Sequence, residues 1–406
     1  MRRLFAHHNT EKRPLSQGCP LSLEDRLIIL VRQRMAHIAI DGRKYFDFGI
    51  GTYIRNLVAA IARSNTSHSY SLLVAPDDLA RIESPSGWKN HATRLKKYSF
   101  GEMALLGLEA RKAGADLLHV PHYTLPLGLR RRSVVTIHDL VHVAFPQYFT
   151  IGQRAYAQAM LRHAARAAGA VITGSHTAKR DIVSLFRIDE RRVHVIYHGI
   201  QSCFKSVEDS GRLDGFRERF GLHAPFILYV GNIKPHKNIP ALLRAFKSLA
   251  HVQKDLELAF AGESLYRNTE LSALVDELAI RPLVRDLGRL PSNDLVCAYN
   301  AAEAVVLPSF YEGFGFTALE AMACGTPVVV SNGGSLPEVV GDAALVFDPS
   351  EDGALEAALG AVLQDGGVRD SLIAKSRRNI ERFSWEAAAR ETIRVYESVL
   401  DEFPAR

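Results

Sequence analysis

Short apolar runs alternate with amphipathic stretches from residue 35 almost to the C-terminal end. The runs lie at 36–40, 70–75, 117–120, 134–137, 170–173 and 193–196, and then at 226–231, 256–262, 284–288, 304–309, 327–331 and 344–347. Helical spacing is found at 52–63, 153–168, 176–186, 239–251, 270–279, 292–301, 316–324, 351–363, 369–382 and 384–402. Strands that are apolar throughout and alternate with helices indicate parallel sheets covered on both faces.

The alternation is interrupted once, by the polar, glycine-bearing segment 201–224, which is typical of a linker plus a short helix. We therefore predict an α/β chain with two Rossmann-like, doubly wound domains, 35–205 and 222–383, that face a central cleft. A last helix follows at 384–402, with Ser384 as its N-cap. Ligands of such sheets bind beyond the carboxyl ends of the strands, so the cleft is the predicted site.

Residues 1–34 differ from the rest, because they are rich in Arg, His, Ser and Gln and show no period. We expect this stretch to be a flexible N-terminal extension. Met35, which opens the first strand pattern, is either the true start of the protein or its first ordered residue.

Composition narrows the class of protein. Of 406 residues, 47% are hydrophobic and 23% charged, which is typical of globular domains and excludes disorder or coiled coil as the main architecture. The net charge of +6 suits anionic small ligands or an acidic lipid surface and is too weak to indicate nucleic acid. The four cysteines form no CxxC pair, and no apolar run approaches a membrane span or a signal peptide. These features favour a cytoplasmic location.

The strongest local signal is the strand-loop-helix pattern in 308–331. Its loop carries Gly313 and Gly315, and its helix begins near Phe316. The backbone amides of Phe316 and Thr317 then lie free at a helix N-terminus, which is a binding site for anions such as phosphate.

Two glutamates accompany this loop. Glu320 lies one turn into the predicted helix, where its carboxylate can accept two hydrogen bonds from a vicinal diol. Glu312 precedes the helix and could reach the group beyond the phosphates. Phosphate on the amides and ribose on Glu320 would make a site for a nucleoside diphosphate. The alternative is a glycine-rich turn with solvated glutamates.

A second loop follows the first strand of the second domain, in 229–246. Asn238 is positioned to cap the next helix, which has Pro240 in its first turn. Lys237 stands beside that helix start, where an ammonium group can neutralise a pyrophosphate. Lys234 is a second candidate cation, and a solvated basic turn is the alternative.

In the first domain, Gly49 and Gly51 stand between the first strand and the first predicted helix, where backbone amides could approach a phosphate or an acceptor hydroxyl. This signal is weak by itself. His138 and Asp139 follow another strand and should face the cleft. The letters HDLVH (138–142) also resemble a zinc-binding HExxH pattern, which requires a helix that the preceding strand disfavours.

Basic residues gather in the predicted helix 153–168 and at Arg130 to Arg132. Arg154, Arg162, His163 and Arg166 belong to the helix. These groups could contact an anionic membrane that presents a lipid-linked acceptor, or they could form an ordinary solvated face.

Glu312 and Glu320 form an E-x7-E pattern in EGFGFTALEAM, followed by GTPVVVSNGGSLPEVVGDAALVFDP. This stretch resembles the retaining GT-B glycosyltransferases of family 4, the glycosyltransferase group 1 proteins, and the resemblance covers most of 36–400. It implies that Glu320 holds the nucleotide ribose and that Glu312 contacts the donor sugar.

The resemblance assigns further roles. Lys237 matches the family's diphosphate lysine, whereas Asn232 stands where many members carry an arginine, so Lys234 could serve as the second cation. Gly49 and Gly51 match the family's glycine loop, and His138 matches a histidine that positions the donor sugar. We take Glu312, His138 and Lys237 as catalytic candidates. The other donor-binding candidates are Glu320, Gly313, Gly315, Phe316, Thr317, Asn232 and Lys234, with Gly49, Gly51 and Asp139 on the acceptor side.

The expected function is a glycosyltransferase that moves a sugar from a nucleoside-diphosphate sugar to a glycan or lipid-linked acceptor with retention of configuration. The segments TIHDL, GNIKPHKN and SLPEV resemble mannosyltransferases of bacterial surface polysaccharide and lipopolysaccharide synthesis. No D-x-D sequence occurs, so we expect no essential metal and no cofactor. A nucleotide-sugar epimerase, a phosphorylase and a non-catalytic nucleotide-sugar-binding protein are the alternatives.

Overall fold

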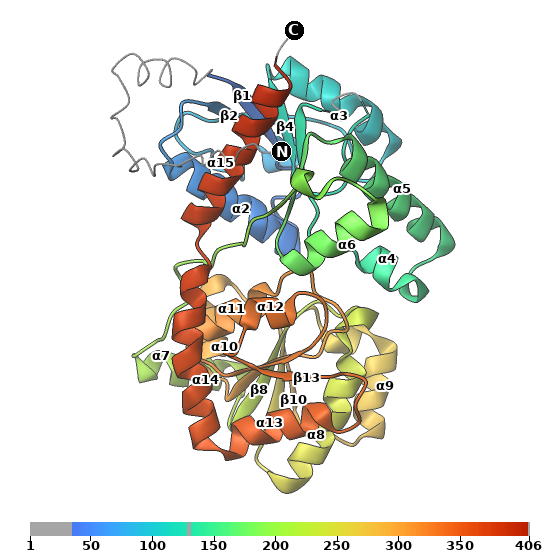
Figure 1. Ribbon diagram of the computed structural model, residues 1–406. Helices are drawn as coiled ribbons and strands as arrows, with labels where there is room; N and C mark the ends of the chain where they lie inside the picture. Colours follow the sequence, from blue (N-terminus) through green and yellow to red (C-terminus); the bar gives the residue numbers. More distant parts are fainter. Residues whose placement is uncertain (1–34, 128–130, 405–406) are drawn as a thin grey trace, which may run out of the picture.

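The computed structural model describes residues 35–127 and 131–404. The expected extension 1–34 and Arg130 lie outside these ranges. Two α/β domains are stacked on one another, and each has a parallel sheet between layers of helices (Figure 1). The predicted fold class is therefore confirmed.

The first sheet has the strand order β3-β2-β1-β4-β5-β6-β7, and every described pairing is parallel. Its strands are β1 (His37–Asp41), β2 (Ser69–Val74), β3 (Lys89–Ala92), β4 (Leu117–Val120), β5 (Ser133–Thr136), β6 (Ala170–Thr173) and β7 (Val193–Val195). Its helices are α2 (Phe48–Arg63), α3 (Phe100–Lys112), α4 (Val141–Ala144), α5 (Ile151–Ala167) and α6 (His176–Phe186). The apolar pattern missed β3 because this edge strand is polar and half-exposed.

The second sheet has the order β10-β9-β8-β11-β12-β13, again parallel throughout the described pairings. Its strands are β8 (Phe226–Gly231), β9 (Glu257–Gly262), β10 (Val284–Gly288), β11 (Ala304–Leu307), β12 (Val328–Ser331) and β13 (Leu345–Phe347). The helices in this half of the chain are α7 (Ser210–Phe220), α8 (Ile239–Val252), α9 (Thr269–Glu277), α10 (Ser292–Ala301), α11 (Phe316–Ala323), α12 (Leu336–Val340), α13 (Ala354–Gln364) and α14 (Gly366–Asn379), followed by α15 (Trp385–Glu402), which packs on the first domain.

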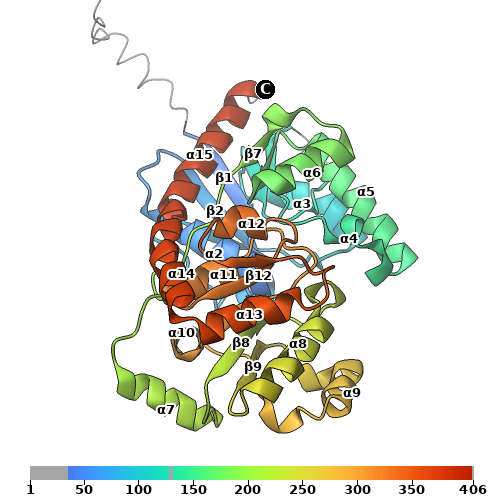
Figure 2. The same cartoon turned by 60° about the horizontal axis from the view of Figure 1, so that its bottom comes forward.

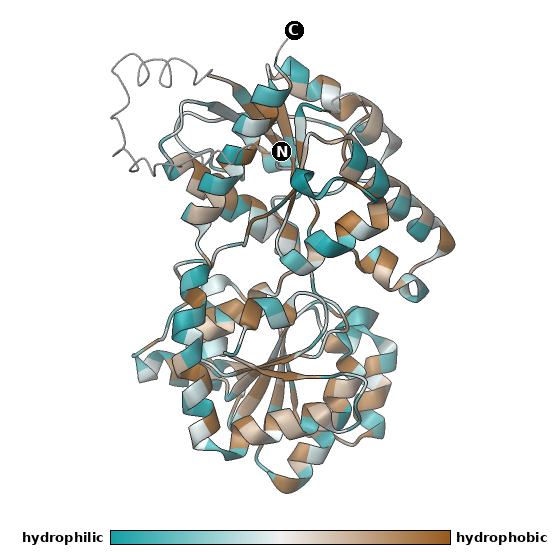
Figure 3. Cartoon of the chain, viewed as in Figure 1, coloured by the Kyte–Doolittle hydropathy of each residue, from teal (hydrophilic) through white to brown (hydrophobic). Residues whose placement is uncertain are grey.

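Each sheet has an apolar core on both faces. In the first domain, α2 and α15 cover one face and α3, α5 and α6 cover the other. In the second domain, α10, α11 and α12 oppose α8, α9 and α13. The central strands are buried along their whole length, and hydrophobic colours fill the middle of each domain in Figure 3. Burial on both faces explains why these strands show continuous apolar runs.

Strand order reverses once in each sheet, between β1 and β4 and between β8 and β11. At such a point the connections leave in opposite directions and open a crevice at the carboxyl ends of the strands. The loops that carry most of the predicted site residues follow β5, β8 and β11, at or beside these two crevices.

The last helix belongs to the first domain although its sequence follows the second. In both Figure 1 and Figure 2, α14 and α15 run along one side of the molecule, α14 on the second domain and α15 on the first. The hydroxyl of Tyr396 lies 2.6 Å from His119 Nδ1 in β4. Ser384 accepts a hydrogen bond from the amide of Ala387, which confirms it as the N-cap.

The chain crosses between the domains where Gly199 meets the start of α15. A Cβ atom at Gly199 would lie 2.2 Å from the amide nitrogen of Trp385. We expect Gly199→Ala to destabilise the protein by ~2 kcal/mol or more, because two backbone segments must separate. Thermal unfolding measures this. Gly215→Ala in α7 is the control, since that Cβ would meet nothing within 4 Å, and it should be neutral or slightly stabilising. Equal melting temperatures for Gly199→Ala and wild type would contradict the prediction.

Candidate active site

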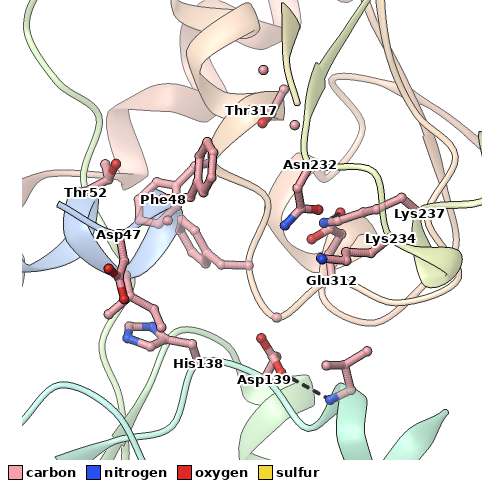
Figure 4. Close-up of a pocket in the computed structure, with 18 of the residues that line it drawn as sticks. Asp47, Phe48, Thr52, His138, Asp139, Asn232, Lys234, Lys237, Glu312 and Thr317 are labelled. Atoms are coloured by element: carbon pink, nitrogen blue, oxygen red, sulfur yellow. Dashed lines mark hydrogen bonds and ion pairs between the residues drawn. The ribbon is translucent and has the colours of Figure 1, made fainter. Parts of the chain in front are cut away.

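A cavity of about 1530 Å³ lies between the two domains. Figure 4 shows His138, Asp139 and Asp47 of the first domain facing Asn232, Lys234, Lys237 and Glu312 of the second. Pockets for one small ligand usually measure about 300–1,000 Å³, so this cavity has room for two substrates. Its wall includes these predicted residues: Glu312, His138, Lys237, Glu320, Gly313, Gly315, Phe316, Thr317, Asn232, Lys234, Gly49 and Asp139.

An ion pair stands at the second domain's side of the cavity. Lys237 Nζ lies 2.6 Å from Glu312 Oε1, and the hydroxyl of Ser309 donates to the same oxygen at 2.7 Å. Burial raises the pKa of Glu312, but the charge and hydrogen bond of Lys237 outweigh it, so the pKa is below its usual value. Glu312 is therefore ionised at neutral pH, and the contact with Lys237 fixes the positions of both side chains.

Glu320 occupies the opposite electrostatic environment. It lies one turn into α11 and accepts a hydrogen bond from the hydroxyl of Tyr299 at 2.7 Å. Burial raises the pKa of Glu320 to about 7, with the Tyr299 bond opposing the shift. Deprotonated Glu320 can accept from two neighbouring hydroxyls, which is the chemistry of a ribose diol. Sequence analysis missed Tyr299, which comes from another helix.

The first two residues of α11, Phe316 and Thr317, have backbone amides without acceptors inside the helix. Gly315 precedes them with a φ of 111°, a conformation that favours glycine. These amides face the same cavity as Lys237 and Glu320. The arrangement can therefore bind an anion between an ammonium group and a helix N-terminus.

Gly313 lines the cavity and also brings the two domains together. A Cβ atom at Gly313 would lie 2.0 Å from the carbonyl oxygen of His138, in the other domain. The absence of a side chain therefore lets the loop that carries Glu312 touch the first domain directly.

His138 is positioned by that domain. Its Nε2 lies 3.1 Å from the carbonyl oxygen of Pro121, and burial lowers its pKa, so the ring is neutral at pH 7. The proton then sits on Nε2, which donates to Pro121, and Nδ1 is left as an acceptor. Asp139 accepts from the amide of Val141 at 3.2 Å (Figure 4). Because α4 begins only at Val141, HDLVH does not form the single helix that the zinc pattern requires.

Gly51 corrects the interpretation of the glycine loop. The helix α2 begins at Phe48, four residues earlier than expected, so both glycines lie inside its first turn. The amide of Gly51 already donates to Asp47, and its missing Cβ leaves room for the carbonyl of Tyr45. Of these two glycines, Gly49 lines the cavity and Gly51 does not.

The loop after β8 also departs from expectation. Asn238 precedes α8 in a left-handed conformation, and its side chain forms no capping bond. Lys234 is exposed at the cavity rim. Arg289, which sequence analysis missed, also lines the cavity and stacks over Phe48 of the first domain at 4.8 Å. Arg289 follows the last residue of β10 directly, and its position at the carboxyl end of a predicted strand could have identified it as a candidate.

Glu338 of α12 joins the domains. Its carboxylate accepts from the amides of His176 and Thr177, at 2.7 and 2.9 Å, and from the hydroxyl of Tyr197 at 3.0 Å. A carboxylate of the second domain thus caps α6 of the first. Burial opposes ionisation of Glu338, yet these bonds hold its pKa below the usual value.

The capped start of α6 is also tied to the loop that carries Glu312. Ser175 Oγ lies 2.6 Å from Ser335 Oγ, and both side chains are buried. The amide of Ser335 donates to the carbonyl of Glu312 at 2.9 Å. Sequence analysis quoted the SLPEV segment without assigning this role, because the partners lie about 160 residues away.

Solved structures share this arrangement of two domains. Sucrose-phosphate synthase from Thermosynechococcus elongatus aligns with a TM-score of 0.74 at 23% identity, over 91% of this chain and 100% of that one. HepE of Anabaena in complex with UDP-glucose aligns with a TM-score of 0.71 at 18% identity, over 89% and 100%. The fold is GT-B, the two-domain class of glycosyltransferases.

Sequence comparison identifies the family within that class. Residues 215–379 match the family described as "Glycosyl transferases group 1", and residues 49–202 match "Glycosyltransferase Family 4". O-antigen chain mannosyltransferase B of Escherichia coli is 32% identical over 372 residues, which covers 87% of this chain and 97% of that protein. The chain belongs to the group 1, or family 4, glycosyltransferases.

Glu338→Ala tests the contact between the domains. Removing the carboxylate leaves the α6 amides without their acceptor, so we expect a loss of ~1–2 kcal/mol in stability and slower transfer. Affinity for nucleoside diphosphate should stay unchanged, because Glu338 does not line the cavity. Thermal unfolding measures the stability, titration calorimetry measures the affinity, and product formation measures the rate of transfer. Glu381→Ala, an exposed carboxylate, is the control. Equal stability of the two variants would show that the cap contributes nothing.

Glu320→Gln should stabilise the protein at alkaline pH. In the folded wild type the protonated form of Glu320 is favoured. The stability that this form contributes is fully present below the ordinary glutamate pKa of 4.5 and is lost as the pH rises to about 7. Glu320→Gln carries no titrating group at this position and loses no stability between these pH values. Its gain in stability over the wild type therefore grows as the pH rises and then stays at ~1–3 kcal/mol. Melting temperatures at about pH 5 and pH 8 measure it. A stability difference between the variant and the wild type that does not grow with pH would contradict a raised pKa of Glu320.

Proposed function

We propose that this glycosyltransferase transfers a hexose, mannose in particular, from a nucleoside-diphosphate sugar to a glycan or lipid-linked acceptor in the synthesis of a bacterial surface polysaccharide. The observation that carries the proposal is the Lys237–Glu312 pair beside Glu320 and the start of α11, in one cavity with His138. The E. coli relative, an O-antigen mannosyltransferase, supports the sugar and the pathway. The HepE complex with UDP-glucose supports the class of donor.

In this proposal the donor lies against the second domain. The diphosphate meets the amides of Phe316 and Thr317 and the ammonium of Lys237, which has three donor protons and can keep its bond to Glu312. Glu320 accepts from the ribose diol, and Glu312 accepts from a hydroxyl of the sugar. The lysine and the helix dipole, without an essential metal ion, stabilise charge on the departing diphosphate.

Transfer proceeds with retention through attack on the same face of the sugar. The bond between the anomeric carbon and the diphosphate oxygen breaks, and the acceptor oxygen bonds to that carbon. The acceptor proton passes to the departing diphosphate. The neutral ring of His138 offers Nδ1 to a sugar hydroxyl and so orients the reacting ring.

A membrane contact of the first domain accompanies the proposal. Leu105 and Leu108 of α3 and Ile151 of α5 are exposed, and Arg162 of α5 is exposed as well. Exposed apolar side chains and an exposed cation on the same domain are features that favour an anionic lipid surface. Among the residues that the structure describes, no helix is long and apolar enough to cross a membrane.

Variants of the ion pair should separate binding from transfer. Glu312→Gln frees Lys237, so we expect the affinity for nucleoside diphosphate to stay equal or rise, whereas transfer falls by about 10²–10³. Lys237→Ala should lower both the affinity for nucleoside diphosphate and the rate of transfer. Thermal-shift assays with GDP, UDP, ADP and TDP measure binding, and release of nucleoside diphosphate from the matching sugars measures turnover. Glu381→Ala is again the control.

The same assay separates the alternatives. An epimerase converts the donor without acceptor, whereas a transferase gives a product whose α or β linkage is visible by NMR. An inverted anomeric configuration would contradict the same-face mechanism. Nucleotide binding without any turnover or transfer would indicate a non-catalytic binding protein.

A further inference from the structure

A row of five rings lines the first domain's wall of the cavity, and the proposed chemistry uses none of them. We call this row the aromatic strip, and it consists of Tyr98, His122, Tyr123, His142 and Phe149. Successive ring centroids are 5.6, 3.9, 6.2 and 4.2 Å apart, so each ring contacts the next. The strip is assembled from segments before α3, after β4, in α4 and before α5.

Two polar atoms of the cavity wall along the strip have no hydrogen-bond partner among the described residues. His122 is 7% exposed, and its Nδ1 forms no hydrogen bond within the described part of the chain. The hydroxyl of Tyr156, on α5, is buried and likewise contacts no described donor or acceptor at hydrogen-bond distance. Both residues line the cavity. Because an unsatisfied buried polar atom costs about 1–3 kcal/mol, this pair indicates a ligand that supplies hydrogen-bonding groups here.

The end of the strip is held in a strained conformation. Tyr98 has a φ of 59°, which costs a non-glycine residue about 1–2 kcal/mol. Its amide donates to Glu102 at 2.5 Å, and Glu102 is paired with the buried Arg43 at 2.7 Å. Arg43 is fixed in turn by Asp41 at 2.6 Å. A buried charge network thus presents the half-exposed Tyr98 ring to the cavity, and strain of this kind is typical of binding sites.

The strip offers no free positive charge. Burial lowers the pKa values of His122 and His142, so both rings are neutral at pH 7. Among the described residues that line the first domain's wall, Arg55 is the single lysine or arginine, and its guanidinium is engaged by Tyr45 and Thr52.

The remaining charges near the strip do not favour an anion. Asp47 and Asp139 line the same wall. Lys44 Nζ lies 3.8 Å from the centroid of the Tyr98 ring, but Lys44 is buried and does not line the cavity. Asp47 is paired with Lys97 at 2.7 Å, which leaves Asp139 as the other carboxylate of this wall. Among the described residues of the first domain's wall, a phosphorylated acceptor would therefore meet no unpaired cation, since Lys234 and Arg289 belong to the second domain.

We propose that the aromatic strip, with His122 and Tyr156, is the acceptor subsite and binds an uncharged oligosaccharide of at least two sugar rings. The inference rests on the proposed transferase function and adds the class of its acceptor. The apolar faces of pyranose rings stack on the aromatic rings, and sugar hydroxyls supply partners for His122 Nδ1 and the Tyr156 hydroxyl. A row of five rings exceeds one pyranose, which favours a chain over a single sugar or a small polyol.

The test uses the full chain with GDP or UDP present, whichever binds. Titration calorimetry with a panel of neutral oligosaccharides, including mannobiose and mannotriose, is compared with D-inositol 3-phosphate. We expect a neutral oligosaccharide to bind, Tyr98→Ala and Phe149→Ala to weaken it about tenfold or more, and Tyr156→Phe to weaken it several-fold. Tyr266→Ala, a half-exposed aromatic residue outside the cavity, should leave it unchanged.

Tyr156→Phe removes one oxygen atom and keeps the ring, so its result does not depend on altered folding. Affinity for the nucleoside diphosphate should be the same in all variants, because the strip lies in the other domain. Binding of inositol phosphate in place of every neutral oligosaccharide, or wild-type affinity in the strip variants, would overturn the acceptor assignment. Failure of the wild type to bind any nucleoside diphosphate would instead contradict the proposed function.

Discussion

The site depends on direct contact between two backbones from different domains. The loop that carries Glu312 approaches the carbonyl of His138 so closely that a Cβ atom at Gly313 has no room. Each domain supplies half of the cavity wall, so neither half forms a site alone. The cap that Glu338 places on α6 and the buried Ser175–Ser335 contact hold the same loop from its other side. The distance between His138 and Glu312 is thus set by packing between domains.

The two glutamates of the second domain show how environment divides similar groups. Glu312 is kept ionised by Lys237, and the pair is fixed before any substrate contributes. Among the described residues no cation is paired with Glu320, so burial makes its ionised form costly. The buried carboxylate lowers the stability of the protein at a position where it can bind a diol. Functional sites commonly reduce stability in this way.

The sequence predicted most of the fold and most of the candidate residues that the second domain contributes to the cavity wall. Strands buried on both faces have a continuous apolar signal, and the helix start after β11 follows from glycine positions that are local in the chain. Predictions from local sequence were wrong at two helix starts, where the backbone conformation differs from the one that the residue types favour. The α2 helix begins before its glycines, and the left-handed Asn238 cannot use its side chain as a cap.

Other features could not be predicted because their parts meet only in three dimensions. Glu338 and its partners on α6 are about 160 residues apart. The rings of the aromatic strip come from four connecting segments and have no common spacing in the chain. A β–α alternation specifies where strand ends gather, but the particular side chains that meet there depend on how each connection packs.

His138 connects the two sides of the cavity. Its carbonyl touches Gly313 beside Glu312, and its ring donates to Pro121, the residue before His122 of the aromatic strip. A shift of the loop that carries Glu312 therefore reaches the first domain's wall of the cavity through one residue. Because reacting atoms must approach within a few tenths of an ångström of their productive positions, such a short link is a physical reason to place a neutral, doubly held histidine at this junction. In the proposed function, His138 keeps donor and acceptor aligned, and Lys237 and the start of α11 stabilise the charge that develops during transfer.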